Sequence, residues 1–217
     1  AAGGTGIKAT GAAHQITVGG LTDVSLKNGI YETNAIYANG AAIKLNGGLS
    51  ADVAVTSPDT SAYGVRVENG GSVTTGSGGK SLRVDSASGS AYGIDISSDK
   101  VSTINIAKDL AVKGAAGGTG IKATGAAHQI TVGGLTDVSI AVDARKVIYA
   151  ADGANVNLNG GVSLDVTGTG DVSGIKADNG GNVTVSGDKA IVKATTTGSG
   201  AKAYAVSNTG SGDVTIN

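Results

Sequence analysis

The feature that most constrains this chain is a repeat with a period of 27 to 31 residues that runs along the whole sequence. Each unit carries one dipeptide in which a residue that is usually Gly or Ala precedes Ile or Val. The eight dipeptides are Gly6-Ile7, Ala35-Ile36, Gly64-Val65, Gly93-Ile94, Gly120-Ile121, Val147-Ile148, Gly174-Ile175 and Ala205-Val206. A period of this length indicates a solenoid, in which every repeat is one supersecondary unit that stacks on the next.

Within each unit, apolar and polar residues alternate over three short stretches. In the first unit these stretches are GIKA from Gly6, ITV from Ile16 and VSL from Val24. An alternation of period two predicts β-strands with one buried face. Clusters such as NGG at 69–71 separate the stretches and favour turns, because Gly and Asn tolerate positive φ. With 38 Gly in the chain and no sustained 3.6-residue apolar pattern, we expect no helix.

Three strands per unit predict an all-β fold, namely a three-sided parallel β-helix of about eight turns that forms one domain over 1–217. Each strand should pair with its equivalent one turn away, at a spacing of ~4.8 Å. The winding should be right-handed, as parallel crossovers almost always are. Ile, Val, Leu and Ala should fill the interior. Val132, for example, should lie inside, between Val156 and either Ile104 or Ile106.

A longer repeat is superimposed on the short one. Residues 1–25 recur without change at 115–139, and the LNGG that begins at Leu45 returns at Leu158. The chain therefore contains an internal duplication, 1–114 and 115–217. The second copy stops after the second stretch of its fourth unit, so we expect the chain to be a segment of a longer solenoid.

The composition narrows the classes of function. Sixteen basic and 17 acidic residues give a net charge of −1, which favours neither nucleic acid nor a membrane surface as a partner. The absence of Cys excludes disulfides and thiolate metal sites. The sequence contains no recognisable catalytic motif. We therefore expect a protein that is not an enzyme and has no cofactor and no metal.

The repeated units also resemble a known family. The pattern (A/Y)G(I/V)(K/R/D)A…NGG…VTV(S/N)G and the Cys-free composition rich in Gly, Ser, Thr, Asn and Ala are similar to the passenger region of bacterial autotransporters and related surface-secreted β-helical adhesins. The resemblance implies export to the bacterial cell surface, with a membrane translocator outside this chain. It also implies a glycan or protein on a host or neighbouring cell as the partner, or self-association.

The best candidate binding face is the outward row of the first stretch. That row is expected to contain Lys8, Tyr37, Arg66, Asp95, Lys122, Tyr149, Lys176 and Ser207. Six of these residues form what we call the strip: Lys8, Tyr37, Arg66, Lys122, Tyr149 and Lys176. Basic groups beside aromatic faces suit glycans or anionic polymers. The alternative is a solvated face on which Tyr and Asp keep like charges apart.

Two further outward rows suggest other functions. The second stretch places five Thr in the row Thr17, Lys44, Thr74, Asn105, Thr131, Asn157, Thr184 and Thr215, a pattern compatible with ice binding. Aspartates directly precede the third stretch at Asp23, Asp52, Asp109 and Asp137. Carboxylates stacked in neighbouring turns can hold calcium, and a polysaccharide-degrading β-helix would use such a cluster.

The two histidines, His14 and His128, lie four turns apart, roughly 19 Å at the strand spacing, and cannot share a metal or a charge relay. The leading hypothesis is therefore a structural and adhesive stalk segment of a surface-exposed, secreted bacterial protein. The alternatives are a polysaccharide-degrading enzyme and an ice-binding solenoid.

Overall fold

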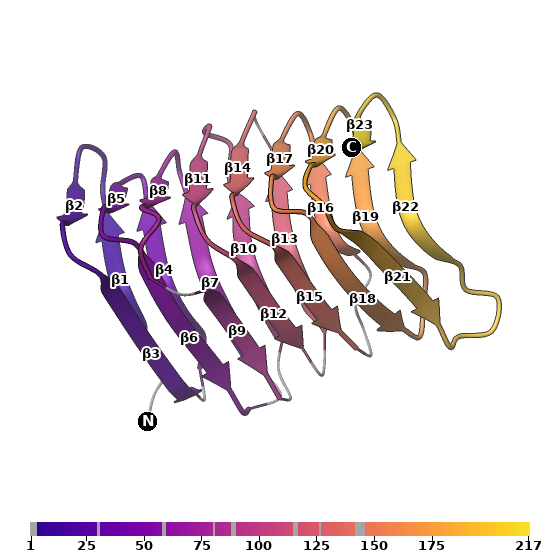
Figure 1. The fold of residues 1–217 in the computed structure, drawn as a ribbon, viewed down its shortest axis with the longest axis horizontal. Helices are drawn as coiled ribbons and strands as arrows, with labels where there is room; N and C mark the ends of the chain where they lie inside the picture. The colour runs from indigo at the N-terminus through magenta and orange to yellow at the C-terminus, as the bar shows by residue number, and fades with distance from the viewer. Residues whose placement is uncertain are drawn as a thin grey trace.

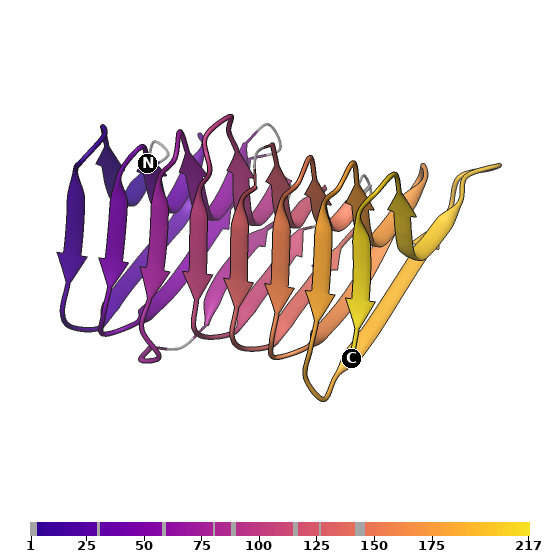
Figure 2. The same cartoon turned by 90° about the horizontal axis from the view of Figure 1, so that it is seen from above.

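The computed structural model describes residues 4–29, 31–57, 60–79, 81–87, 90–114, 117–125, 127–141 and 146–217. These residues form an elongated stack of 23 β-strands, and no helix occurs among them. Figures 1 and 2 show the strands side by side along the long axis, with residues 5–29 and 203–216 at opposite ends.

The strands belong to three sheets, two of eight strands and one of seven. Sheet 1 contains β1 (Thr5–Thr10), β4 (Thr33–Asn39), β7 (Ser61–Glu68), β10 (Ser90–Ser97), β13 (Gly118–Thr124), β16 (Lys146–Ala151), β19 (Val172–Asp178) and β22 (Ala203–Thr209). Sheet 2 contains β2 (Gln15–Val18), β5 (Ala42–Leu45), β8 (Ser72–Thr75), β11 (Thr103–Ile106), β14 (Gln129–Val132), β17 (Asn155–Leu158), β20 (Asn182–Val185) and β23 (Asp213–Ile216). Sheet 3 contains β3 (Thr22–Gly29), β6 (Leu49–Val55), β9 (Leu82–Ser86), β12 (Leu110–Gly114), β15 (Thr136–Ile140), β18 (Val162–Gly168) and β21 (Ala190–Thr196).

Every neighbouring pair is parallel and joins equivalent strands of successive turns, as β1 with β4 and β4 with β7. The prediction of a three-sided parallel β-helix is therefore confirmed. The described strands make seven complete turns and the first two strands, β22 and β23, of an eighth. The right-handed winding stays a prediction.

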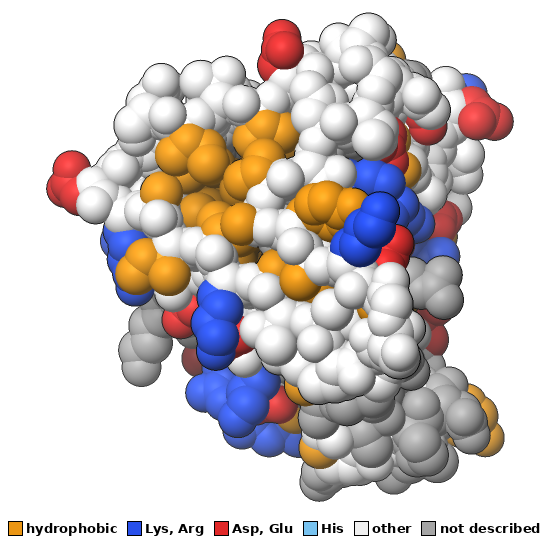
Figure 3. Space-filling view, turned by 90° about the vertical axis from the view of Figure 1, so that its right-hand side faces the viewer, with side chains coloured by type: hydrophobic (Ala, Val, Ile, Leu, Met, Phe, Trp, Pro, Cys, Tyr) orange, Lys and Arg blue, Asp and Glu red, His pale blue; other side chains and the backbone are white. Residues whose placement is uncertain are grey.

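The core is a set of aliphatic ladders along the solenoid axis. One ladder of sheet 1 consists of fully buried residues paired turn by turn: Ile36, Val65, Ile94, Ile121, Ile148 and Ile175. Burying one such side chain contributes about 1.5–3 kcal/mol. Figure 3, which views the C-terminal end, shows apolar side chains gathered over the centre of that end.

The predicted interior position of Val132 is confirmed, but one predicted neighbour is wrong. Val132 is fully buried and pairs with Ile106 on one side and Leu158 on the other. Val156 pairs instead with Ile130, because the register of β14 and β17 places it two residues earlier on the strand. Side chains of one face repeat every two residues, so the error keeps the face and changes the neighbour.

The first residue of the repeated dipeptide is usually small because a larger side chain would clash with sheet 3. A methyl group added at Gly93 would lie 2.5 Å from Cγ2 of Val112, which projects from sheet 3. At Gly174 the equivalent distance to Cγ1 of Val192 is 2.2 Å. Sheets 1 and 3 thus approach each other closely where these glycines lie. The NGG turns also behave as predicted, since Asn69 has φ 52° and Asn179 has φ 46°.

Candidate functional site

The strip lies in one row on the outer face of sheet 1. Strand pairing places its members and Asp95 opposite one another in the predicted order: Lys8, Tyr37, Arg66, Asp95, Lys122, Tyr149, Lys176 and Ser207. The tertiary structure therefore brings together residues that are 27 to 31 positions apart in sequence. Their role as a ligand-binding site stays a prediction.

Arg66 is the most highly connected member of the strip. Its guanidinium nitrogens lie 2.8 Å from a carboxylate oxygen of Glu32 and 2.7 Å from one of Glu68. Its guanidinium carbon lies 5.9 Å from the ring centroid of Tyr37 and 5.0 Å from that of Tyr63. Sequence reasoning found Arg66 in its row but missed Glu32, just before β4, and Tyr63 and Glu68, on the same strand as Arg66.

Tyrosines extend this cluster on both sides of Arg66. The Tyr37 hydroxyl donates a hydrogen bond to Glu68 at 2.7 Å, and burial together with that carboxylate raises the pKa of Tyr37. The rings of Tyr63 and Tyr92 stack with centroids 4.8 Å apart and an interplanar angle of 9°. Burial is the main cause that raises the pKa of Tyr63 to about 12. Offset aromatic pairs of this kind contribute about 0.5–1.5 kcal/mol beyond area burial.

Asp95 is a nearly buried carboxylate in the middle of the row, with only 7% of its surface exposed. Its Oδ1 has no hydrogen-bond partner among the residues that the structure describes, and Nζ of Lys122 lies 3.7 Å away. Burial raises the pKa of Asp95, and the positive charges of Lys122 and Arg66 oppose that rise. The central part of the row is therefore a network in which two cations, Arg66 and Lys122, contact carboxylates.

The remaining basic residues of the strip differ in their partners. Nζ of Lys176 lies 3.0 Å from Oδ2 of Asp178. Nζ of Lys146 lies 3.6 Å from the ring centroid of Tyr149. Burial, together with the carboxylate of Asp178, raises the pKa of the Tyr149 hydroxyl. Lys8 is exposed, lies 5.5 Å from the Tyr37 ring centroid, and has no ion-pair partner among the described residues.

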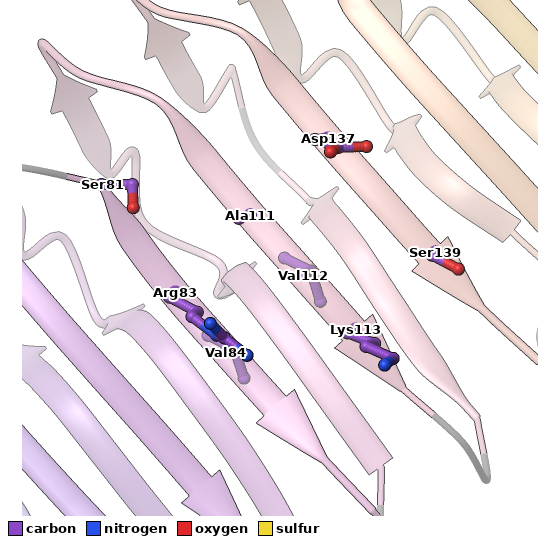
Figure 4. A pocket seen from close by; sticks show the side chains of 8 residues that line it. All are labelled: Ser81, Arg83, Val84, Ala111, Val112, Lys113, Asp137 and Ser139. Carbon is purple, nitrogen blue, oxygen red and sulfur yellow. The ribbon is translucent and has the colours of Figure 1, made fainter.

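Sequence reasoning missed a pocket of about 320 Å³ on the outer face of sheet 3. Figure 4 shows Arg83, Lys113 and Asp137 around it, on three successive strands. The pocket exists because Ala111 stands between Arg83 and Asp137 in one row. Arg83 is paired with Asp85 at 3.0 Å. A short side chain in a row of long charged ones is the sequence signal that marks this pocket.

A second pocket, of about 300 Å³, lies on the outer face of sheet 1 near the C-terminal end. Lys176 of the strip belongs to its wall. The other lining residues are Lys146, Asp171, Ser173, Tyr204, Ser207 and Thr209. The wall of this pocket therefore combines two lysines, one aspartate, several hydroxyls and one aromatic ring.

The expected stacking of aspartates in neighbouring turns is wrong. Asp23 lies opposite Ser50, whereas Asp52 lies opposite Ser25 and Arg83. Asp137 lies opposite Ala111, whereas Oδ1 of Asp109, just before β12, accepts the Leu135 N–H. The alignment assumed from sequence was off by two residues in both pairs. Among the described residues, no three His, Asp or Glu side chains are grouped so that they could hold a metal ion.

The threonine row predicted on sheet 2 forms as a row, with Thr17 opposite Lys44 and Thr184 opposite Thr215. The row beside it is mixed, since Gln15, Ala42 and Ser72 follow one another there. His14 and His128 occupy equivalent corners of the first and fifth turns, as expected, and they differ in burial. His14 is exposed, and His128 is fully buried.

These features define the class of protein: a three-sided parallel β-helix with an aliphatic interior and a charged, tyrosine-bearing outer face on sheet 1. Comparison with models of protein families, with curated proteins and with solved structures finds no match to this chain. Within the part of the chain that the structure describes, no helix is long and apolar enough to span a membrane.

Proposed function

We propose that this chain is a structural and adhesive stalk segment of a surface-exposed, secreted bacterial protein. The observation that carries the proposal is the uninterrupted pairing of all three sheets from the first strand to the last. In such a solenoid each turn contacts its neighbours, so added turns add length at a constant cross-section. A rod of this kind can hold a binding surface away from a cell.

The strip is the surface proposed to make contact. It presents ring faces and basic groups at regular spacing along the rod axis, and Lys8 has no acidic partner among the described residues. The proposed partner is a glycan or protein on a host or neighbouring cell, or a second copy of the chain. Exposed charges are individually weak, so binding would depend on the array.

A retention experiment on immobilised heparin, an anionic glycan, tests the strip. The test variant replaces Lys8, Lys122 and Lys176 with Ser and keeps Arg66, because Arg66 holds two ion pairs within the fold. The control variant replaces Lys27, Lys113 and Lys193 on sheet 3, which changes the net charge equally. Within the described part of the chain, each set contains two lysines with an acidic partner and one without.

We expect the parent and the control to be retained at low salt, and the strip variant to elute earlier. Retention should also fall with added salt, since screening acts within ~10 Å at 0.1 M. Circular dichroism should be the same for all three proteins. If both variants lose retention equally, or if the parent is not retained, the strip is not the contact surface.

The proposed location has a separate test. The Cys-free composition and the resemblance to autotransporter passengers support export. An antibody raised against this chain should label intact bacteria that produce the native protein. Labelling only after the cells are permeabilised would contradict a surface location, whatever the result on heparin.

A further inference from the structure

Two equivalent positions of sheet 1, four turns apart, carry different side chains. On β7, Tyr63 lies opposite Tyr92 of the next turn, and the two rings stack. On β19, Ser173 occupies the matching position and lies opposite Tyr204. The sequence AYG occurs around Tyr63 and Tyr92, whereas VSG occurs around Ser173. The second half of the sheet thus keeps one tyrosine of the pair and lacks the other.

A pocket lies beside Ser173, where the second half lacks the tyrosine ring. Ser173, Tyr204, Lys146 and Lys176 line the pocket of about 300 Å³ described above. Ser173 is only 6% exposed, whereas 40% of the surface of Tyr204 is exposed. Tyr63, in the first half, fills its own position and is 9% exposed. The pocket is therefore the place that a tyrosine ring occupies four turns earlier.

The charges around this position also change between the two halves. Arg66 lies over the Tyr63 ring at 5.0 Å, and Lys176 takes the row position of Arg66 in the second half. Lys146 lies opposite Ser173, where Asn34 lies opposite Tyr63. Ser207 replaces the carboxylate of Asp95. Asp171 of the pocket wall stands where Ser61 lies in the first half. At its lining positions the pocket therefore has one cation more than its counterpart and the same number of acids.

The charged groups near the pocket, acids and lysines alike, have partners, and Nζ of Lys146 lies 3.6 Å from the ring centroid of Tyr149. Asp178 is paired with Lys176 at 3.0 Å, and Oδ1 of Asp171 accepts the Lys202 backbone N–H at 2.8 Å. Ser173 and Ser207 contribute small hydroxyl groups to the pocket. The wall is thus suited to a flat ring whose substituent is polar or negatively charged.

We propose that this pocket binds a phenol ring, which takes the place of the Tyr63 ring and stacks on Tyr204 between Lys146 and Lys176. Cations favour an aromatic face over a saturated ring, because only the aromatic face carries a negative quadrupole. The ring comes either from a free phenolic acid or from a tyrosine side chain of a partner polypeptide. This inference goes beyond the proposed stalk function and does not depend on binding of glycans by the strip.

The first experiment uses 4-hydroxyphenylacetate as the probe and cyclohexylacetate as its saturated control, titrated into the full chain and followed by NMR. Both molecules carry one carboxylate and one six-membered ring. We expect the phenolic acid to bind about fivefold more tightly, the factor that one aromatic contact supplies. Equal affinities would show that charge alone attracts the probe, and would overturn the proposal, as would no binding at all.

The second experiment exchanges the side chains between the two halves. Ser173→Tyr should fill the pocket, abolish binding of the phenolic acid and raise the melting temperature by about 2–4 °C. Ser163→Tyr, on the outer face of sheet 3, is the matched control and should leave binding unchanged. Tyr63→Ser should open a similar space beside Tyr92, which should bind the phenolic acid more weakly than the native pocket, because Asn34 stands there in place of Lys146 and Asp95 in place of Ser207. Unchanged binding in Ser173→Tyr would place the probe elsewhere and overturn the proposal.

If Ser173→Tyr does not fold, Tyr204→Ala serves instead, because it removes the stacking partner at an exposed position. Loss of the preference for the phenolic acid supports the pocket, and a retained preference overturns it. The source of the ring is decided with a blocked Gly-Gly-Tyr-Gly-Gly peptide. Tighter binding of this peptide than of the phenolic acid assigns the pocket to a partner's tyrosine, and weaker binding assigns it to a free phenolic acid.

Discussion

The identical segments 1–25 and 115–139 differ in burial because they lie at different places in the stack. Ile121, Ile130 and Val132 of the second segment are fully buried. Their counterparts in the first segment, Ile7, Ile16 and Val18, are only partly buried. The strands β13, β14 and β15 lie between two neighbouring turns, whereas β1, β2 and β3 have a neighbour on one side. In a solenoid, adjacent turns decide how much of a side chain is buried.

The histidines show the same difference in polar contacts. Nδ1 of His128 accepts the Ser102 N–H at 3.1 Å, and its Nε2 lies 3.0 Å from the Ser98 carbonyl oxygen. Both partners belong to the preceding turn. Nδ1 of His14 instead faces the Thr10 carbonyl oxygen within its own turn. These partners require Nε2–H in His128 and Nδ1–H in His14, so the neighbouring turn also selects the tautomer.

The largest expected difference between the two segments comes from a charge placed in the interior. Val132→Asp would bury an unpaired carboxylate and should lower the free energy of unfolding by several kcal/mol. Val18→Asp should cost less than half as much, because one side of Val18 is open. Urea unfolding followed by circular dichroism measures both. Equal losses would show that burial in the stack does not control stability.

The next largest difference in stability between the two segments should come from a cavity in the core. Ile130→Ala removes a fully buried side chain and should cost about 2–5 kcal/mol. Ile16→Ala, at the same position of the identical sequence, should cost about half of that or less, because Ile16 is only partly buried. The same urea experiment compares them, and a larger loss for Ile16→Ala would reverse the order that the stack predicts.

The histidine contacts should give a smaller effect. His128→Ala leaves the buried N–H of Ser102 without its acceptor, which should cost about 1–3 kcal/mol. His14→Ala should change stability by about 0.5 kcal/mol or less, as exposed substitutions usually do. Thermal unfolding of both variants at neutral pH is the measurement. If the two melting temperatures agree, the contacts of His128 contribute nothing beyond those of His14.

The smallest difference concerns Lys122 and Lys8, and it depends on pH. Asp95 has a raised pKa in the folded state, so it binds protons more tightly there than in the unfolded chain. Stability should therefore fall as the pH rises from the ordinary Asp value through the raised pKa. Lys122→Ala removes a charge that opposes this rise, so the fall should become larger and extend to higher pH. Lys8→Ala should leave the profile unchanged, since Lys8 is not among the groups that affect the pKa of Asp95. Urea midpoints between pH 3 and 7 test the pair, and superimposable profiles would contradict the role of Lys122.

Most of the fold could be predicted from the sequence because the repeat specifies it many times over. The dipeptide at Gly93-Ile94 returns in every unit, and each return indicates the same strand of the same turn. The row of the strip followed from this period alone. Predictions failed where the register differed from the assumed one by two residues, as for Asp52 and Val156. A period of two identifies the face of a strand but leaves its exact partner to the turns.

The candidate sites were less predictable, because they depend on neighbours in adjacent rows. Arg66 could be placed on the surface from its row, but its ion pairs with Glu32 and Glu68 could not. The pockets beside Ala111 and Ser173 arise where a short side chain stands among long ones on three successive strands. Such a space is a property of the assembled face and of the side-chain rotamers on it.

By itself, the sequence determined the period, the three strands of each turn, the inward and outward faces, and the positions of the NGG turns. These features are local, and alternation and turn chemistry encode them within one unit. Only the tertiary structure decided which copy of an identical segment is buried, which histidine tautomer is required, and which space the absent ring leaves beside Tyr204. These properties depend on contacts between side chains of neighbouring turns. The sequence of one unit does not specify which side chains the adjacent turns place beside it.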